Sequence, residues 1–219
     1  LGCLALLFLL GRRVRGPGLG IVLAFAWAAY PFTLYASNTN SNDALVPLVL
    51  LLALLAASRP VARGAAAALG GMTKLATLAV APLFATHAAR GARDVLRFSL
   101  AFAAVAALAL LPVWLDGPSL REVYDRTLGF QAGRDAPFAI WRLCALKSLQ
   151  RVWQVIAVLL ALVVAVLPRR RDVVGLAALA AAVLIAFQLG ATYWFYLYLV
   201  WFAPLVWLAL FGRYAAPAR

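Results

Sequence analysis

The sequence predicts an all-α, polytopic membrane helix bundle, and three observations support this fold class. Of the 219 residues, 66% are hydrophobic and 12% are charged, and the mean hydropathy is +0.95. Soluble domains are about 45–50% apolar and about 25% charged. The apolar residues form runs of Leu, Ala and Val without the alternation of a membrane β-strand. Backbone groups in lipid must pair within their own segment, so these runs are expected to be helices.

The apolar runs follow one another along the whole chain, which predicts a single transmembrane domain over residues 1–219. A helix needs about 20 apolar residues to span the bilayer. Because the first run starts at residue 1, we interpret the chain as the C-terminal part of a longer membrane region. The runs lie at 1–10, 19–36, 44–57, 65–87, 98–115, 152–167, 173–189 and 194–211.

The net charge of +13 comes mainly from arginines that flank the apolar runs. We therefore attribute the charge to membrane topology and not to nucleic-acid binding. Lys and Arg accumulate on the cytoplasmic side. SNTNSND (37–43) contains neither and is predicted to lie outside, together with 116–151, where acidic and basic residues nearly balance. The segments predicted to lie inside are 11–15, 58–64, 88–97, 168–172 and the C-terminal tail.

The run 65–87 lies between two segments assigned to the same side, so one crossing does not fit it. Gly70 and Gly71 weaken a helix in the middle of this run, and Lys74 places a full charge there. We therefore predict a re-entrant broken helix with its break near 71–74, a geometry that needs a protein-lined or wet surrounding. The alternative is one ordinary span with a snorkelling Lys74, which would reverse every later loop.

The outer segment 116–151 is predicted to contain short interfacial helices. Ser119 and Glu122 have the spacing of a capping box. Apolar residues follow at helical spacing, and a second amphipathic pattern leads into the next run. These residues are Leu120, Val123, Tyr124 and Leu128 in the first pattern, and Leu143, Leu146, Leu149 and Trp153 in the second.

Lys74 is a candidate functional residue, because an ionisable side chain within a membrane helix is costly. No carboxylate lies within one helical turn of it. Its partner is therefore another segment, water or an anionic ligand such as a phosphate. Arg134, in a loop bounded by Gly and Pro on the same face, is a second candidate phosphate ligand. The alternative for Arg134 is a solvated loop arginine.

The residues Asn38, Asn40, Asn42 and Asp43 form a polar cluster at the start of an apolar run. A carboxylate is favoured at a helix N-terminus, and Asn42 or Asp43 is a suitable N-cap. Capping and loop solvation are therefore one explanation of the cluster. Because the asparagines exceed what one cap requires, we also hypothesise that the four residues line a sugar or acceptor pocket.

The remaining chemistry-bearing residues suggest no other kind of site. His87 is the single histidine, and Cys3 and Cys144 are too few for a disulfide framework. No metal-spaced set is present, so neither a metal nor another cofactor is expected. An aromatic belt at the outer interface is favoured over sugar stacking for Tyr193, Trp194, Tyr196, Tyr198 and Trp201.

Three stretches of the sequence resemble those of a known class of membrane enzymes: YPFTLYASNTNSNDALVPLVLLLAL, RGAAAALGGMTKLATLAVAPLF and GRDAPFAIW. They resemble the GT-C type, polyprenyl-phosphate-sugar-dependent membrane glycosyltransferases, and the nearest resemblance is to glycosyltransferase family 87, which is mannosyltransferase-like. The resemblance covers most of residues 20–211, although Thr77 stands where related sequences often have proline. It implies transfer of a sugar, for example mannose, from a polyprenyl-phosphate donor to a glycan or glycolipid acceptor. The transfer would occur on the extracytoplasmic face of the cell membrane.

The same resemblance implies a catalytic Asp or Glu in the first extracytoplasmic loop, which would precede Leu1. The leading hypothesis is therefore a glycosyltransferase in which Lys74 and Arg134 bind the donor phosphate. One alternative is a non-enzymatic lipid-linked-sugar transporter or flippase, which should show inverted repeats and several polar midplane residues. Another is a structural membrane subunit, in which the polar groups only cap helices.

Overall fold

The computed structural model describes residues 1–39, 41–130, 134, 138–143, 146–167 and 172–213, and within them all regular structure is helical. Three helices are long and apolar enough to cross a membrane. These are α7 (Ala92–Leu115), α11 (Lys147–Val166) and α12 (Val173–Gly190). The predicted all-α class is confirmed, and the helices have the length and composition that a lipid bilayer requires.

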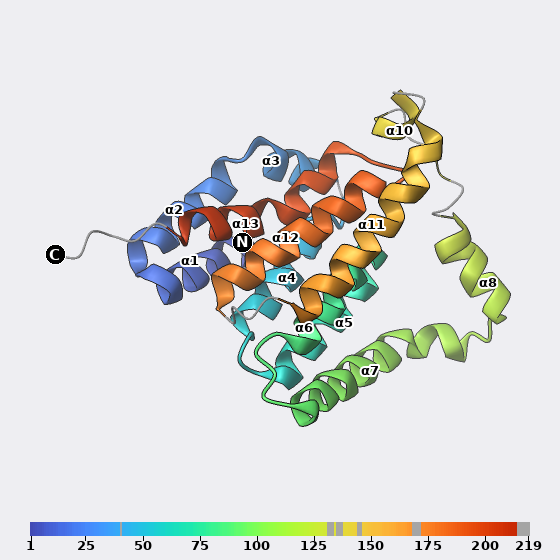
Figure 1. The fold of residues 1–219 in the computed structure, drawn as a ribbon, viewed down its shortest axis with the longest axis horizontal. Helices are drawn as coiled ribbons and strands as arrows, with labels where there is room; N and C mark the ends of the chain where they lie inside the picture. Colours follow the sequence, from blue (N-terminus) through green and yellow to red (C-terminus); the bar gives the residue numbers. More distant parts are fainter. Residues whose placement is uncertain (40, 131–133, 135–137, 144–145, 168–171, 214–219) are drawn as a thin grey trace.

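The other elements are shorter (Figure 1). The pair α2 and α3 is bent by 55° at Tyr30, and together these helices would make a fourth span. The shorter α-helices are α1 (Gly2–Arg15), α2 (Pro17–Ala29), α3 (Pro31–Asn38), α4 (Leu45–Leu55), α5 (Pro60–Thr73), α6 (Ala81–Thr86), α8 (Leu120–Tyr124), α10 (Ile140–Leu143) and α13 (Leu199–Phe211). Two 3₁₀ helices, η1 (Leu75–Val80) and η3 (Tyr196–Tyr198), and a π-helical turn, η2 (Asp125–Gly129), complete them.

Glycines allow the closest helix contacts in the bundle. The chain reverses between α1 and α2 at Gly16, where φ is 87°. A Cβ atom on Gly11 would lie 2.6 Å from the Gly20 backbone, so the two helices approach closely because neither residue has a side chain. In the same way, Gly64 of α5 lies against the backbone carbonyl of Phe98 in α7.

Hydrogen bonds from two arginines of α1 hold three helix ends together at one end of the bundle. Arg13 Nη1 donates to the carbonyl of Leu55 at 2.8 Å, and Arg15 Nη1 donates to that of Phe211 at 3.0 Å. These bonds join the last turn of α1 to the C-terminal ends of α4 and α13. The guanidinium groups also satisfy carbonyls that a helix end leaves without partners.

The opposite end of the bundle is held by side-chain donors from α11. Trp153 Nε1 donates to the carbonyl of Ala186 at 2.8 Å. Gln150 and Gln154 both donate to the carbonyl of Gly190, at 3.1 and 2.9 Å. Such bonds matter in an apolar surrounding, where no water replaces a missing partner. They fix the C-terminal end of α12 and therefore the start of the segment that leads into α13.

Helix α7 packs against α5 but leaves most of its surface exposed. Phe98, near its N-terminal end, is its buried residue, and only 6% of its most apolar window is buried. Figure 1 shows α7 and α8 extending away from the other helices. The capping box at the start of α8 is confirmed, with Ser119 and Glu122 making both reciprocal hydrogen bonds.

Candidate functional site

Helix α5 breaks at Lys74, as the sequence predicts. The helix ends at Thr73, and Lys74 has the extended backbone φ −150°, ψ 124° before η1 begins. The Lys74 carbonyl accepts hydrogen bonds from the Thr77 amide at 3.0 Å and from the Thr77 hydroxyl at 2.9 Å. Thr77 therefore stabilises the break through its own hydroxyl.

The chain folds back after this break. A Cβ atom on Gly70 would lie 3.1 Å from Thr77 Oγ1, so η1 packs against the last turn of α5. At the far end of the segment, the Thr86 hydroxyl donates to the carbonyl of Ala165 near the end of α11, at 2.6 Å. Lys74 is therefore held at a fixed bend between two helical pieces.

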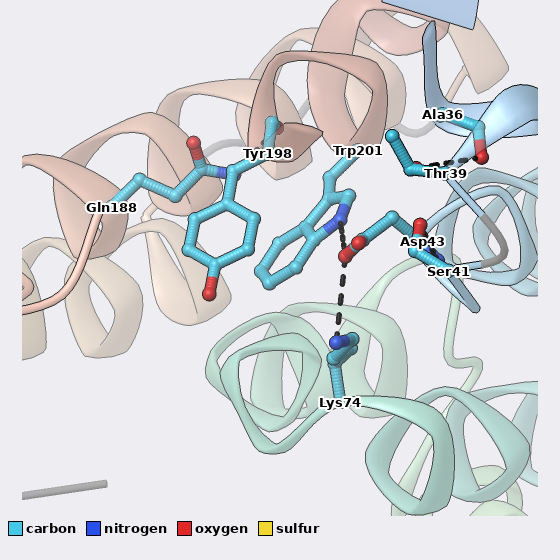
Figure 2. A network of polar contacts seen from close by, with 8 residues as sticks. All are labelled: Ala36, Thr39, Ser41, Asp43, Lys74, Gln188, Tyr198 and Trp201. Carbon is cyan, nitrogen blue, oxygen red and sulfur yellow. Dashed lines mark hydrogen bonds and ion pairs between the residues drawn. The ribbon is translucent and has the colours of Figure 1, made fainter. Parts of the chain in front are cut away.

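Asp43 is the partner of Lys74. Lys74 Nζ lies 3.4 Å from Asp43 Oδ1, and Trp201 Nε1 donates to the same oxygen at 2.9 Å. Figure 2 shows the carboxylate between the indole and the ammonium group. The sequence left three kinds of partner open for Lys74. The structure shows one of them, a residue of another segment of the chain. The site thus joins residues before α4, after α5 and within α13.

Burial differs sharply across this ion pair. The Asp43 side chain is 5% exposed and the Lys74 side chain is 29% exposed. Trp201 is 4% exposed and covers the carboxylate. Because burying an unpaired charge is very costly, Asp43 depends on both donors. Lys74 remains open on one side.

The capping interpretation of Asp43 is wrong. Helix α4 starts at Leu45, its N-cap is Ala44, and no side chain hydrogen-bonds to the free amides of its first turn. The Asp43 amide donates to Ser41 Oγ at 3.3 Å, which holds the turn before the helix. The carboxylate instead points into the bundle, toward Lys74 and Trp201 (Figure 2).

Aromatic contacts connect Arg134 to this pair. The Arg134 guanidinium carbon lies 3.7 Å from the ring centroid of Tyr193, a cation–π distance. Ring centroids are 6.2 Å apart for Tyr193 and Tyr198, and 4.2 Å apart for Tyr198 and Trp201. The two predicted phosphate ligands, Lys74 and Arg134, are therefore linked by an unbroken path of aromatic rings.

The side chains of Asn38 and Asn42 do not hydrogen-bond to Asp43. Asn38 and Asn42 are exposed, and neither side chain hydrogen-bonds to another described residue. Asn40 lies outside the described residues. Their assignment to a sugar or acceptor pocket stays a prediction.

Trp201 is the site residue that sequence reasoning missed. It was assigned to an aromatic belt, but it is buried, with its N–H on Asp43. A tryptophan in an apolar run needs a partner for its N–H when it is buried, yet nothing in the sequence identifies an aspartate 158 residues away. Gln188, also buried, donates through Nε2 to the Tyr198 carbonyl at 3.1 Å and supports the neighbouring backbone.

The described residues contain no group of His, Cys, Asp or Glu arranged to hold a metal ion. The site is therefore an ion pair with an indole donor, and aromatic rings connect it to a second cation, Arg134. No protein-family model, no curated protein and no solved structure matches this chain, so a functional assignment depends on the geometry of these side chains.

Proposed function

We propose that the protein is a GT-C type glycosyltransferase in which Lys74 binds the phosphate of a polyprenyl-phosphate sugar donor. One observation carries the proposal: Lys74 is a partly exposed cation at a helix break, with a single carboxylate partner. An ammonium group has three N–H donors, and the contact with Asp43 uses one. The other two donors are available to phosphate oxygens.

The reaction is an inverting sugar transfer. A hydroxyl oxygen of the acceptor forms a bond to the anomeric carbon, and the bond from that carbon to the phosphate oxygen breaks. The polyprenyl phosphate leaves with the electron pair, and a general base takes the hydroxyl proton. Lys74 lowers the barrier because its charge stabilises the negative charge that develops on the leaving phosphate.

Asp43 and Trp201 position the cation and do not react. The carboxylate keeps Lys74 Nζ at a fixed place, and the indole N–H keeps the carboxylate in turn. Arg134, at the other end of the aromatic path, supplies the second positive charge. By resemblance, the general base is the side chain of an Asp or Glu.

The same proposal places the site on the extracytoplasmic face, with the segment from α5 to α6 entering and leaving the membrane on the cytoplasmic side. Single cysteines at the exposed positions Ser37 and Arg121 should then react from outside with an impermeant thiol reagent, in a background without Cys3 and Cys144. A cysteine at Ser58 should not react in intact cells. External labelling at Ser58 would contradict this orientation.

A second candidate function is supported by the burial of Asp43. The carboxylate is 5% exposed and has two partners, Lys74 and Trp201. This arrangement also suits a structural tether between α4, α5 and α13 in a non-catalytic membrane subunit. In that case Lys74 would bind no ligand. The two functions differ in whether an anionic lipid reaches the ammonium group.

Binding of a short-chain polyprenyl phosphate to the purified protein tests the proposal, with the uncharged polyprenol as the control lipid. The informative comparison is Asp43→Asn against Asp43→Asn/Lys74→Met, because neither variant leaves an unpaired buried carboxylate. Loss of a charge-assisted hydrogen bond of about 1.5–3 kcal/mol should weaken binding about 10- to 150-fold. Equal affinity of the two variants would exclude Lys74 from the phosphate site and leave the tether.

Arg134 is tested in the same assay. Arg134→Gln should weaken phosphate binding, whereas Arg121→Gln, a 91% exposed arginine of the same outer segment, should not. A matched loss in both variants would indicate general attraction between the loop and the anion and not a contact from Arg134.

A further inference from the structure

A groove of about 700 Å³ lies between α1, α4 and α5, and its arginines are at the end of α5 opposite to Lys74. Arg59 immediately precedes α5 and Lys74 immediately follows it. With a rise of about 1.5 Å per residue, the 14-residue helix separates them by about 21 Å. The arginines of the groove are therefore distinct from the cation of the candidate site described above, and Lys74 does not line the groove.

The groove has a cationic end and an apolar body. Arg12, Arg13 and Arg59 line one part of it, and Leu9, Leu52 and Leu69 are among the exposed apolar residues that line the rest. None of the described residues that line it is acidic. Lys and Arg groups close together in such a place repel one another, so an anion is the complementary partner.

Two of these arginines have no described partner. The side chains of Arg12 and Arg59 are exposed and make no hydrogen bond or ion pair with another described residue. Arg13 donates one of its five N–H groups to the Leu55 carbonyl. The remaining donors suit phosphate oxygens, which guanidinium groups bind through paired hydrogen bonds.

The length of the groove indicates what else is bound. Along α5 the lining extends from Arg59 through Ala62, Ala65 and Ala66 to Leu69, residues that share one helix face. This distance is about 15 Å, which is half of a hydrocarbon core of about 30 Å. Small alanines on α5 leave space in the groove that a lipid tail can fill.

We propose that this groove binds an anionic phospholipid, with the phosphate on Arg12, Arg13 and Arg59 and one acyl chain along the apolar body. Basic pockets between transmembrane helices bind anionic head groups in this way. A free phosphate would leave the apolar body empty, and a neutral phospholipid would leave the arginines without a counter-charge. The bound lipid would hold α1 against α4 and α5.

The test is a lipid titration of the purified full chain, with native mass spectrometry to count bound lipids. Phosphatidylglycerol should bind more tightly than phosphatidylcholine of the same acyl composition. Because each arginine near an anionic head group contributes about fivefold, Arg12→Gln/Arg59→Gln should weaken phosphatidylglycerol binding about 30-fold. Phosphatidylcholine binding should not change.

A charge-matched control is Arg90→Gln/Arg93→Gln. Both arginines are exposed, and neither belongs to the groove. These substitutions should leave phosphatidylglycerol affinity unchanged. Equal losses in the two double variants would overturn the site, because they would show a general effect of net charge.

A third variant separates the acyl chain from the head group. Ala62→Trp should fill the groove and weaken lipid binding with all three arginines present. Displacement of the lipid by inorganic phosphate would show a site for a free anion, and a lipid-free dimer would show a second copy in the groove. Either result would overturn the proposal.

Discussion

Replacing Lys74 by methionine should destabilise the folded protein, because it leaves the Asp43 carboxylate buried without a cation. An ionisable side chain within a membrane helix is costly, but the buried carboxylate of Asp43 makes removal of this charge unfavourable. At 3.4 Å and an effective dielectric constant of about 20, the pair attracts with about 5 kcal/mol. Desolvation offsets part of this, and breaking a buried pair from one side costs about 3–5 kcal/mol.

A double-mutant cycle isolates the interaction. Asp43→Asn should cost less than Lys74→Met, since the amide oxygen still accepts from Trp201 and the more exposed Lys74 can reach solvent. The double variant should lose about 2–4 kcal/mol less than the sum of the single variants, because it leaves neither charge unpaired. Free energies of unfolding from denaturant titrations in detergent micelles provide the four values.

The exposed pair of Arg97 and Asp94 is the control. Its charged atoms are also 3.4 Å apart, but the Arg97 side chain is 56% exposed. Surface pairs contribute about 0–1 kcal/mol, so Arg97→Met should have a small effect. The argument from burial would be refuted if the effects of Asp43→Asn and Lys74→Met were simply additive.

Two further predictions concern packing and pH. Gly64→Ala should destabilise the protein by about 1–3 kcal/mol, because the added methyl group would meet the Phe98 carbonyl. Gly18 has open space around it, so Gly18→Ala should not destabilise the protein in the same micelle titration. Hydrogen bonds from the Ser119 amide and hydroxyl lower the pKa of Glu122 below its usual value. A depressed pKa contributes stability above the unfolded-state pKa, and this is lost as the pH falls through the folded value. Amide exchange in α8, corrected for intrinsic rates, should therefore accelerate on acidification in the wild type but not in Glu122→Gln. A wild-type exchange profile that is flat with pH would contradict this cause.

Much of the fold follows from local features of the sequence. The position of the break near Lys74 is predicted from two glycines and a charge, within a run whose flanking basic segments are assigned to the same side. The capping box is predicted from the spacing of Ser119 and Glu122. All of these signals lie close to the feature in the sequence. The bend between α2 and α3 also has a local cause, Pro31 at the start of α3. This bend was not predicted from the sequence, because Pro31 lies within one continuous apolar run.

The candidate site was only partly predictable, because its contacts join distant parts of the chain. Lys74 was identified from the cost of a charge in lipid, a property of one residue. Its pairing with Asp43 depends on how α4 and α5 pack, and the role of Trp201 depends on the placement of α13. Nothing local distinguishes this tryptophan from the aromatic residues around it.

The two side chains of the ion pair differ in burial, so the site is open on the side of Lys74. Asp43 is covered by Trp201 and by Lys74 itself, whereas Lys74 is the more exposed member. An approaching anion would therefore meet the ammonium group before the carboxylate, which lies behind it. The carboxylate of Asp43 would repel such an anion less strongly because Lys74 and Trp201 both contact it. Its attraction for Lys74 keeps the ammonium group in place. A positioned cation of this kind needs little reorganisation when negative charge develops, which is the condition for electrostatic stabilisation of a leaving phosphate.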